Sequence, residues 1–351
     1  MHYFCGSIHD KIACMILVTG GTGLVGSHLL YDLARSGEKI RALRRRNSHV
    51  EQVRKVFSYY SVEAERLFAK IEWVEGELLD YQSVLDVMEG TDEVYHCAAF
   101  VSFNKRDRLE VLRNNIEGTA NMVNAALEQK VRKLGFVSSI AALGRPLSGE
   151  DITEELIWRP SRHTSAYSES KFKSEMEVWR GIAEGLNAVI INPSVIFGPG
   201  MWNRGSGLFF KNIWKGLRYY TLGVNGYVDV RDVVLALTSL MKTEISGERF
   251  IVSSENLSVQ DIFGMIARHL GKAPPSRYAS QAMMSFVQKL DALKSALFFT
   301  APALPKETLH SAHQQVRYSN HKIRQALGME FIPMEKSVME TARQFMKDVQ
   351  R

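Results

Sequence analysis

A glycine-rich turn that joins an apolar run to a helical stretch is the feature that most constrains the fold of this chain. Residues 16–19 read Ile-Leu-Val-Thr, and glycines follow at positions 20, 21, 23 and 26. Glycines at this spacing permit a tight turn after a strand and bring backbone N–H groups close to a pyrophosphate at the start of the next helix. The turn predicts a dinucleotide site made by Gly20, Thr22, Gly23, Leu24, Val25 and Gly26.

Beyond this turn, short β-branched runs alternate with helical stretches, which is typical of a parallel sheet covered by helices on both faces. The expected strands are 16–19, 40–43, 71–74, 94–97, 134–137 and 189–191. We therefore predict an α/β chain with a Rossmann-type, doubly wound parallel sheet and a smaller, mostly helical C-terminal region.

The same pattern divides the chain into parts. A dinucleotide-binding domain is expected over 15–195, with 228–256 returning to it, and a substrate-binding region over 196–227 and 257–351. Residues 1–14 lack a periodic pattern and are expected to be an N-terminal extension outside the fold.

Composition narrows the classes further. The 351 residues are 45% hydrophobic and 23% charged, and no apolar run reaches the roughly 18 residues that a membrane span needs, so we expect a cytoplasmic globular protein. The net charge of +6 is spread along the chain, which does not favour nucleic acid as a partner. We expect a small-molecule substrate, and a homodimer is one assembly that such a chain could form.

No metal site is expected. The three cysteines, Cys5, Cys14 and Cys97, form no CxxC pair, and His310 and His313 have no third ligand at a matching offset.

The segment after the second strand bears on the choice of cofactor. It reads Leu43-Arg44-Arg45-Arg46, where a chain that binds the ribose 2′-hydroxyl of NAD carries an acid. A guanidinium at this place can hold the 2′-phosphate of NADP, and we expect no acid to oppose Arg44 and Arg45 there. Stacking on adenine or facing the solvent are the alternatives, so NADP is the preferred cofactor and NAD the other option.

Two further segments end strands of the same sheet. Glu77 and Leu78 follow the third strand and could meet the adenine edge, and Ala98 and Ala99 follow the fourth, where small residues let the backbone approach the ribose. Packing at the sheet edge is the alternative for both pairs.

A tyrosine and a lysine four residues apart suggest acid–base chemistry. Tyr167 and Lys171 lie in a helical stretch and project from one face of it. A neighbouring cation favours a phenolate, so we expect Lys171 to lower the pKa of Tyr167 from its usual value of about 10. Ser139 ends the fifth predicted strand, at the sheet edge where such folds bind ligands, and can hold a reacting carbonyl oxygen.

Taken in order, these motifs resemble those of the extended short-chain dehydrogenase/reductase family, or NAD-dependent epimerase/dehydratase superfamily, over nearly the whole chain from Met15. The glycines match the family's TGxxGxxG, residues 115–119 match its Asn-Val-x-Gly-Thr helix, and residues 227–233 resemble its Val-Asp-Val-x-Asp-Val motif. The resemblance implies an oxidoreductase with Ser139, Tyr167, Lys171 and Asn115 as catalytic residues. It also implies that Pro193 and Val195 lie in a segment that runs alongside the nicotinamide, and that Tyr167 and Lys171 contact the cofactor.

Within that family the sequence is most similar to the dihydroflavonol-reductase-like and 3β-hydroxysteroid-dehydrogenase-like branches. Asn192 stands where many sugar epimerases carry Arg, and Glu77 replaces the usual Asp. Ser139 is followed by Ile-Ala rather than by the acids of the sugar dehydratases, which disfavours dehydration. The resemblance implies reduction of a carbonyl, or oxidation of a secondary alcohol, with Tyr167 as the acid or base.

The segment between Met201 and Tyr227 is rich in aromatic residues and is expected to line the substrate pocket. We expect the substrate to be largely apolar and to contact Trp202, Arg204 and Phe209 together with Ser139. Glu154 and Glu155, between Ser139 and Tyr167, are interpreted as part of a solvated loop. A nucleotide-sugar epimerase and a cofactor-binding regulator without turnover remain the alternative functions.

Overall fold

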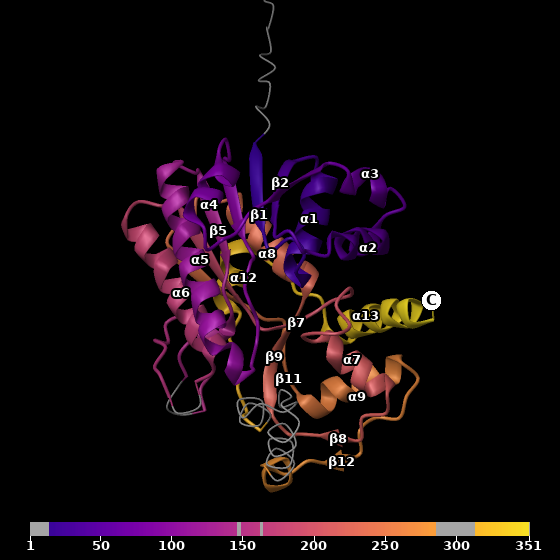
Figure 1. Ribbon diagram of the computed structural model, residues 1–351. Helices are drawn as coiled ribbons and strands as arrows, with labels where there is room; N and C mark the ends of the chain where they lie inside the picture. The colour runs from indigo at the N-terminus through magenta and orange to yellow at the C-terminus, as the bar shows by residue number, and fades with distance from the viewer. Residues whose placement is uncertain (1–13, 146–148, 162–163, 286–312, 351) are drawn as a thin grey trace, which may run out of the picture.

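A seven-stranded parallel sheet lies at the centre of the computed structural model, which describes residues 14–145, 149–161, 164–285 and 313–350 (Figure 1). The strands run in the order β10-β6-β5-β4-β1-β2-β3, and each neighbouring pair is parallel. Their bounds are Met15–Thr19 (β1), Lys39–Arg44 (β2), Ile71–Glu75 (β3), Glu93–His96 (β4), Lys133–Val137 (β5), Ala188–Pro193 (β6) and Glu248–Val252 (β10). The structure confirms the predicted α/β class, and all six expected strands are present.

Alternating side chains of these strands enter two separate hydrophobic clusters, one on each face of the sheet. In β1, Ile16 and Val18 belong to one cluster and Leu17 to the other. A fully buried parallel strand needs apolar residues on both faces, which is why these runs are continuously hydrophobic.

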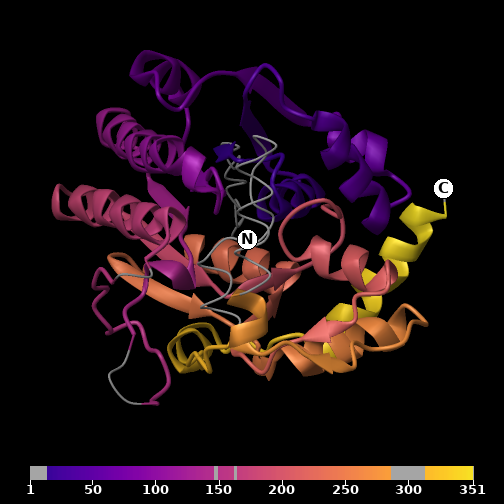
Figure 2. The same cartoon turned by 60° about the horizontal axis from the view of Figure 1, so that its bottom comes forward.

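Helices cover both faces (Figure 2). The helices that pack on the first cluster are α1 (Leu24–Ser36), α2 (Val50–Tyr60), α3 (Ala64–Phe68), α8 (Val230–Met241) and α12 (His321–Leu327). Those on the second cluster are α4 (Tyr81–Met88), α5 (Arg108–Glu128) and α6 (Ala166–Ala183).

The C-terminal part adds small sheets and three helices around a third cluster. Strand β9 (Val224–Asp229) pairs in parallel with β7 (Val195–Phe197) and antiparallel with β11 (Glu255–Ser258), and β8 (Tyr219–Tyr220) pairs with β12 (Arg277–Tyr278). The helices are α7 (Gly207–Trp214), α9 (Val259–His269) and α13 (Met334–Val349).

The order of the strands fixes where a ligand can bind. The chain leaves β1 through α1 toward β2 and β3 on one side, and β4 and β5 follow on the other side of β1. Such a reversal opens a crevice at the carboxyl ends of β1 and β4, where sheets of this kind hold their ligands. Within the described residues, no helix has the length and apolarity that crossing a bilayer requires.

Candidate active site

The glycine-rich turn lies at the carboxyl end of β1. Gly20 has φ of +69°, and its carbonyl accepts a hydrogen bond from the N–H of Gly23 at 2.8 Å. A Cβ at Gly20 would lie 2.6 Å from the backbone nitrogen of Ala98, and a Cβ at Gly26 would overlap the carbonyl of Gly20. Since α1 carries no acid in its first turn, its first N–H groups can hold an anion.

A buried chain of hydrogen bonds ties this turn to the rest of the site. The N–H of Ala98 donates to Thr19 Oγ1 at 3.3 Å, Thr19 Oγ1 lies 2.7 Å from His96 Nδ1, and His96 Nε2 lies 3.1 Å from Thr119 Oγ1. Thr119 in turn donates to the carbonyl of Asn115 at 2.7 Å. Each hydroxyl has one hydrogen, so Thr19 donates to Nδ1, and His96 is neutral with its proton on Nε2. Burial agrees with the neutral form, because it lowers the pKa of His96 to about 3.

Ser139, Tyr167 and Lys171 lie together at the carboxyl end of β5. The Ser139 hydroxyl accepts from the N–H of Ala141 at 3.1 Å, which caps η2 (Ile140–Ala142), and it is hydrogen-bonded to the phenol of Tyr167. Lys171 lies one turn further along α6, and its ammonium donates to the carbonyl of Val137 at 2.8 Å. The fold therefore brings a hydroxyl, a phenol and an ammonium to one place.

The pKa values of this trio differ from the expectation. Burial raises the pKa of Tyr167, and the hydrogen bond from Ser139 opposes that rise. Burial also lowers the pKa of Lys171 to about 8, because the charged ammonium is the form that loses hydration. The expected lowering of the Tyr167 pKa is thus wrong for this structure, because desolvation of the phenol sets the direction of the shift and the opposing contribution comes from Ser139.

The side chain of Asn115 is buried between the loop after β4 and helix α6. Its side chain makes two hydrogen bonds to the backbone of Phe100, at 2.7 and 3.0 Å, and donates to Ser170 Oγ at 2.9 Å. Ser170 Oγ donates to the carbonyl of Tyr167 at 2.8 Å. Asn115 therefore holds the loop after β4 against the helix that carries the tyrosine.

A cavity of about 430 Å³ opens beside the glycine-rich turn and the end of β2. Its lining residues are Thr22, Arg45, Arg46, Asn47, Ser48, His49, Gln52, Glu77 and Arg204. Thr22, Arg45 and Glu77 were expected near a cofactor, whereas Arg46 and residues 47–52 were not. The uninterrupted arginine run of the sequence was the signal for Arg46; the polar residues after it form a turn whose place only the structure gives.

Arg44 does not line this cavity. Its guanidinium forms an ion pair at 2.7 Å with Oε1 of Glu75, the last residue of the neighbouring strand β3. The expectation that no acid lies beside Arg44 is therefore wrong, because the parallel register places Arg44 opposite Glu75. Leu78 packs near Gly118, and its carbonyl accepts from Asn121 at 2.8 Å.

The three predicted substrate residues between Met201 and Tyr227 lie in two different surroundings. Trp202 donates to Asp348 at 2.8 Å and packs edge-on against Phe345, and Phe209 packs against Phe197 and Phe263, so both belong to the third hydrophobic cluster. Arg204 donates to the carbonyl of Thr22 at 3.3 Å and lines the cavity beside the glycine-rich turn.

An aromatic residue that the sequence did not single out contacts the tyrosine instead. Phe103, in the loop after β4, packs edge-on against Tyr167 with ring centroids 5.6 Å apart, and it is 44% exposed. Val101 in the same loop is 57% exposed. Phe103 therefore places an exposed apolar side chain of this loop beside Tyr167.

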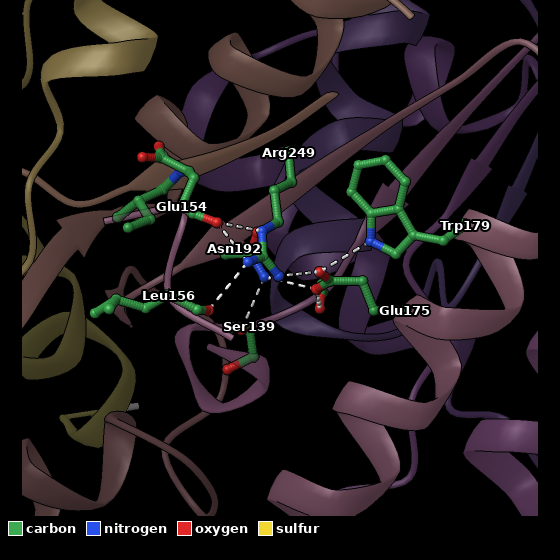
Figure 3. Close-up of polar contacts among 9 residues, drawn as sticks. Ser139, Glu154, Leu156, Glu175, Trp179, Asn192 and Arg249 are labelled. Atoms are coloured by element: carbon green, nitrogen blue, oxygen red, sulfur yellow. Dashed lines mark hydrogen bonds and ion pairs between the residues drawn. The ribbon is translucent and has the colours of Figure 1, made fainter. Parts of the chain in front are cut away.

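A buried ionic cluster lies next to the backbone of Ser139 (Figure 3). Glu175, fully buried on α6, pairs with Arg249 of β10 at 2.8 Å and accepts from Asn192 at 2.8 Å. Arg249 also donates to the carbonyls of Glu154 and Leu156. Glu154 accepts from the N–H of Ile251 at 2.8 Å, so it is anchored to the sheet, and the interpretation of this pair as a solvated loop is wrong for Glu154.

The other motifs lie as follows. Pro193 ends β6 and Val195 begins β7, next to the carboxyl edge of the main sheet. His313 hydrogen-bonds the carbonyl of Ala279 at 2.9 Å, and His310 and residues 1–13 lie outside the described residues. Cys14 packs against the first cluster.

Comparison with known proteins gives consistent results. Residues 16–253 match the model of the NAD dependent epimerase/dehydratase family. Among curated proteins, "Putative dihydroflavonol 4-reductase" of Synechocystis is 28% identical, covering 91% of this chain and 90% of that protein. "Sterol demethylase protein B" of Methylococcus capsulatus is 30% identical, covering 87% and 88%. Among solved structures, gox2253 superposes with a TM-score of 0.78 at 26% identity, covering 95% of this chain and 98% of that one.

Proposed function

The chain belongs to the NAD dependent epimerase/dehydratase family, and from that premise we propose that it reduces a carbonyl group on a largely apolar small molecule. The observation that carries the proposal is the meeting of three groups. The Ser139 hydroxyl is hydrogen-bonded to the Tyr167 phenol, and the Lys171 ammonium lies one helical turn away. Reductase names among its relatives support the same reaction class.

In this proposal Ser139 and Tyr167 hold the carbonyl oxygen through their hydroxyl groups. A bound nicotinamide cofactor supplies the hydride. As negative charge develops on the oxygen, Tyr167 donates its phenolic proton to it. Because burial raises its pKa, Tyr167 is protonated at neutral pH, which is the form that this step requires.

Lys171 has a supporting part. Its ammonium is held at the carbonyl of Val137 and can bond the nicotinamide ribose. With a pKa of about 8, Lys171 is mostly protonated at neutral pH and loses its charge in mild base. We assign the cofactor to residues 15–195 with 228–256, and the substrate to the region formed by 196–227 and 257–351.

We propose NADP as the preferred cofactor, for reasons that differ from those given by the sequence. Arg44 is neutralised by Glu75, so Arg45 and Arg46 at the cavity carry the argument. Arg204 reaches the same cavity from the segment after β7 and adds a third guanidinium. Guanidinium groups that converge on one cavity favour a phosphate there.

The apolar substrate is supported by the loop after β4. Phe103 lies next to Tyr167, whereas Trp202 and Phe209 pack in the third cluster and do not support an apolar substrate. Ligand pockets are largely apolar with a few placed polar groups, and Ser139 and Tyr167 are the placed groups here.

A substrate panel tests this proposal. Aromatic, terpenoid and steroid-like ketones and aldehydes would be offered with NADPH, and the loss of NADPH absorbance followed. The expected result is steady oxidation with at least one class. Conversion of UDP- or GDP-sugars without net NADPH consumption would favour an epimerase, and tight NADPH binding without turnover would favour a regulator.

A further inference from the structure

The buried carboxylate of Glu175 accepts hydrogen bonds from four different side chains. Oε2 accepts from Ser138 Oγ at 2.6 Å and from Asn192 Nδ2 at 2.8 Å. Oε1 accepts from Arg249 at 2.8 Å and from the indole of Trp179 at 3.4 Å. The side chain of Glu175 is 0% exposed, so the Arg249 charge and these donors replace the hydration that an ionised carboxylate loses.

Asn192 connects this carboxylate to the backbone of Ser139. Its Nδ2 donates to the carbonyl of Ser139 at 3.0 Å and to Glu175 at 2.8 Å. Both neighbours are acceptors, so the amide nitrogen must face them and both of its hydrogens are used. With Ser138 bonded to the same carboxylate, two consecutive residues at the end of β5 are fixed to α6.

Arg249 holds the other side of the cluster. Its guanidinium bonds Glu175 and also the carbonyls of Glu154 and Leu156, in the segment that leads from Ser139 toward Tyr167 (Figure 3). The pair therefore joins β10, α6 and this segment, and Asn192 connects it to the backbone of Ser139.

We propose that Glu175, held by Arg249, is a positioning residue that sets Ser139 against Tyr167 and Lys171 through its bonds to Ser138 and Asn192. The inference rests on the proposed reductase function, in which that alignment is needed. Ser139 follows a strand end and Tyr167 lies on a helix. On that helix Lys171 donates to the carbonyl of Val137, and Glu175 accepts from the side chain of Ser138, the residue next to Ser139.

Stability by itself is a weak reason for such a cluster. Burying two charges costs hydration, and well-packed apolar side chains of similar volume are often as stable as a buried ion pair. A fixed direction of hydrogen bonding is what apolar packing could not supply here.

Glu175 also acts on the charge of Lys171. It lies one turn from Lys171 on α6, and its negative charge raises the pKa of that ammonium against the effect of burial. The other groups that face Lys171 are Tyr167 on the same helix and, at the end of β4, Cys97 and the neutral His96. Removing the charge of Glu175 should therefore move the deprotonation of Lys171 to lower pH.

The test compares Glu175→Gln with Glu177→Gln, two residues further along the same helix. The carboxylate of Glu177 is 29% exposed and pairs only with Arg180 among the described side chains. We expect Glu175→Gln to lower kcat about tenfold to hundredfold, since a displacement near 1 Å can cost about a hundredfold, with a smaller change in KM. Its basic pH limb should move to lower pH, and Glu177→Gln should match the wild type. Normal kcat and an unshifted limb in folded Glu175→Gln would overturn the proposal.

Ser138→Ala serves as the second variant in case Glu175→Gln does not fold. It removes one donor to the carboxylate and leaves the ion pair, and we expect a severalfold fall in kcat without a comparable change in NADPH affinity. An unchanged kcat in Ser138→Ala would count against the alignment.

One readout does not need turnover. If the wild type reduces nothing, the reductase proposal fails, and the pH dependence of NADPH binding, followed by its fluorescence, still tests Glu175. A midpoint at lower pH in Glu175→Gln supports its action on Lys171, and an identical midpoint refutes it.

Discussion

Replacing Tyr167 by Phe removes one oxygen from the site and leaves the surrounding packing in place. The ring keeps its edge-on contact with Phe103, and Lys171 keeps its bond to the carbonyl of Val137. The lost hydrogen bond to Ser139 costs about 1 kcal/mol of stability, partly offset because a phenol no longer has to be buried. The variant should therefore fold and bind NADPH almost as the wild type does.

Its chemistry should change far more than its stability. A positioned acid contributes about 10² to 10⁴ in rate, so Tyr167→Phe should raise the barrier by roughly 3–5 kcal/mol. The proton transfer stabilises the negative charge that develops on the substrate oxygen in the transition state. Its loss should therefore lower kcat and have a small effect on KM. The raised pKa of Tyr167 makes the protonated phenol the resting form, so this loss should be present throughout neutral pH.

The assay is NADPH oxidation with the best carbonyl substrate from the panel, paired with a fluorescence titration of NADPH. Tyr219→Phe is the matched control, because it makes the same change at a 40% exposed tyrosine on β8. A Tyr167→Phe rate close to that of the wild type, or an equal loss in Tyr219→Phe, would refute the assignment of the proton donor.

Three further predictions address the cofactor, the substrate and stability. Arg45→Ala combined with Arg46→Ala should weaken NADPH binding at least tenfold, as each bond from a charged group to phosphate contributes about 1.5–3 kcal/mol, and should leave NADH binding unchanged in calorimetry. Phe103→Ala should raise KM for an aromatic carbonyl up to about tenfold and change kcat less, since a lost ring contact is worth about 0.5–1.5 kcal/mol. Burial raises the pKa of Asp232 to about 6, so its contribution to stability is complete below the unfolded pKa and is lost as pH rises through 6. In urea unfolding, Asp232→Asn should therefore lose less stability than the wild type between pH 4 and pH 7. An equal loss in both proteins would show that the titration of Asp232 does not cause the pH dependence.

Local patterns were sufficient wherever a single strand, turn or helix carried the information. The glycine spacing after β1 needs only neighbouring residues to be interpreted, and the four-residue offset puts Tyr167 and Lys171 on one face of α6. The alternation of short apolar runs with helices was sufficient to predict a parallel sheet, whereas the order of its strands comes from the structure.

Local composition was less informative where a side chain packs against residues that are distant in the sequence. The aromatic residues after Met201 suggested a pocket lining, but Trp202 faces α13 and Phe209 faces α9 and β7. A run of aromatic side chains has the same sequence pattern whether it packs in a core or lines a cavity, since both remove apolar surface from water.

The sequence by itself determined the α/β class and the glycine-rich turn after the first strand. It also determined that a serine follows the fifth strand and that a tyrosine and a lysine share one face of a helix. Only the tertiary structure decided the charges around those groups. Register places Glu75 beside Arg44, burial raises the pKa of Tyr167, and Arg249 meets Glu175 although the two residues are 74 apart in the chain. Hydrogen bonds and ion pairs of this kind depend on distances of a few ångströms between segments, and local periodicity carries no such information.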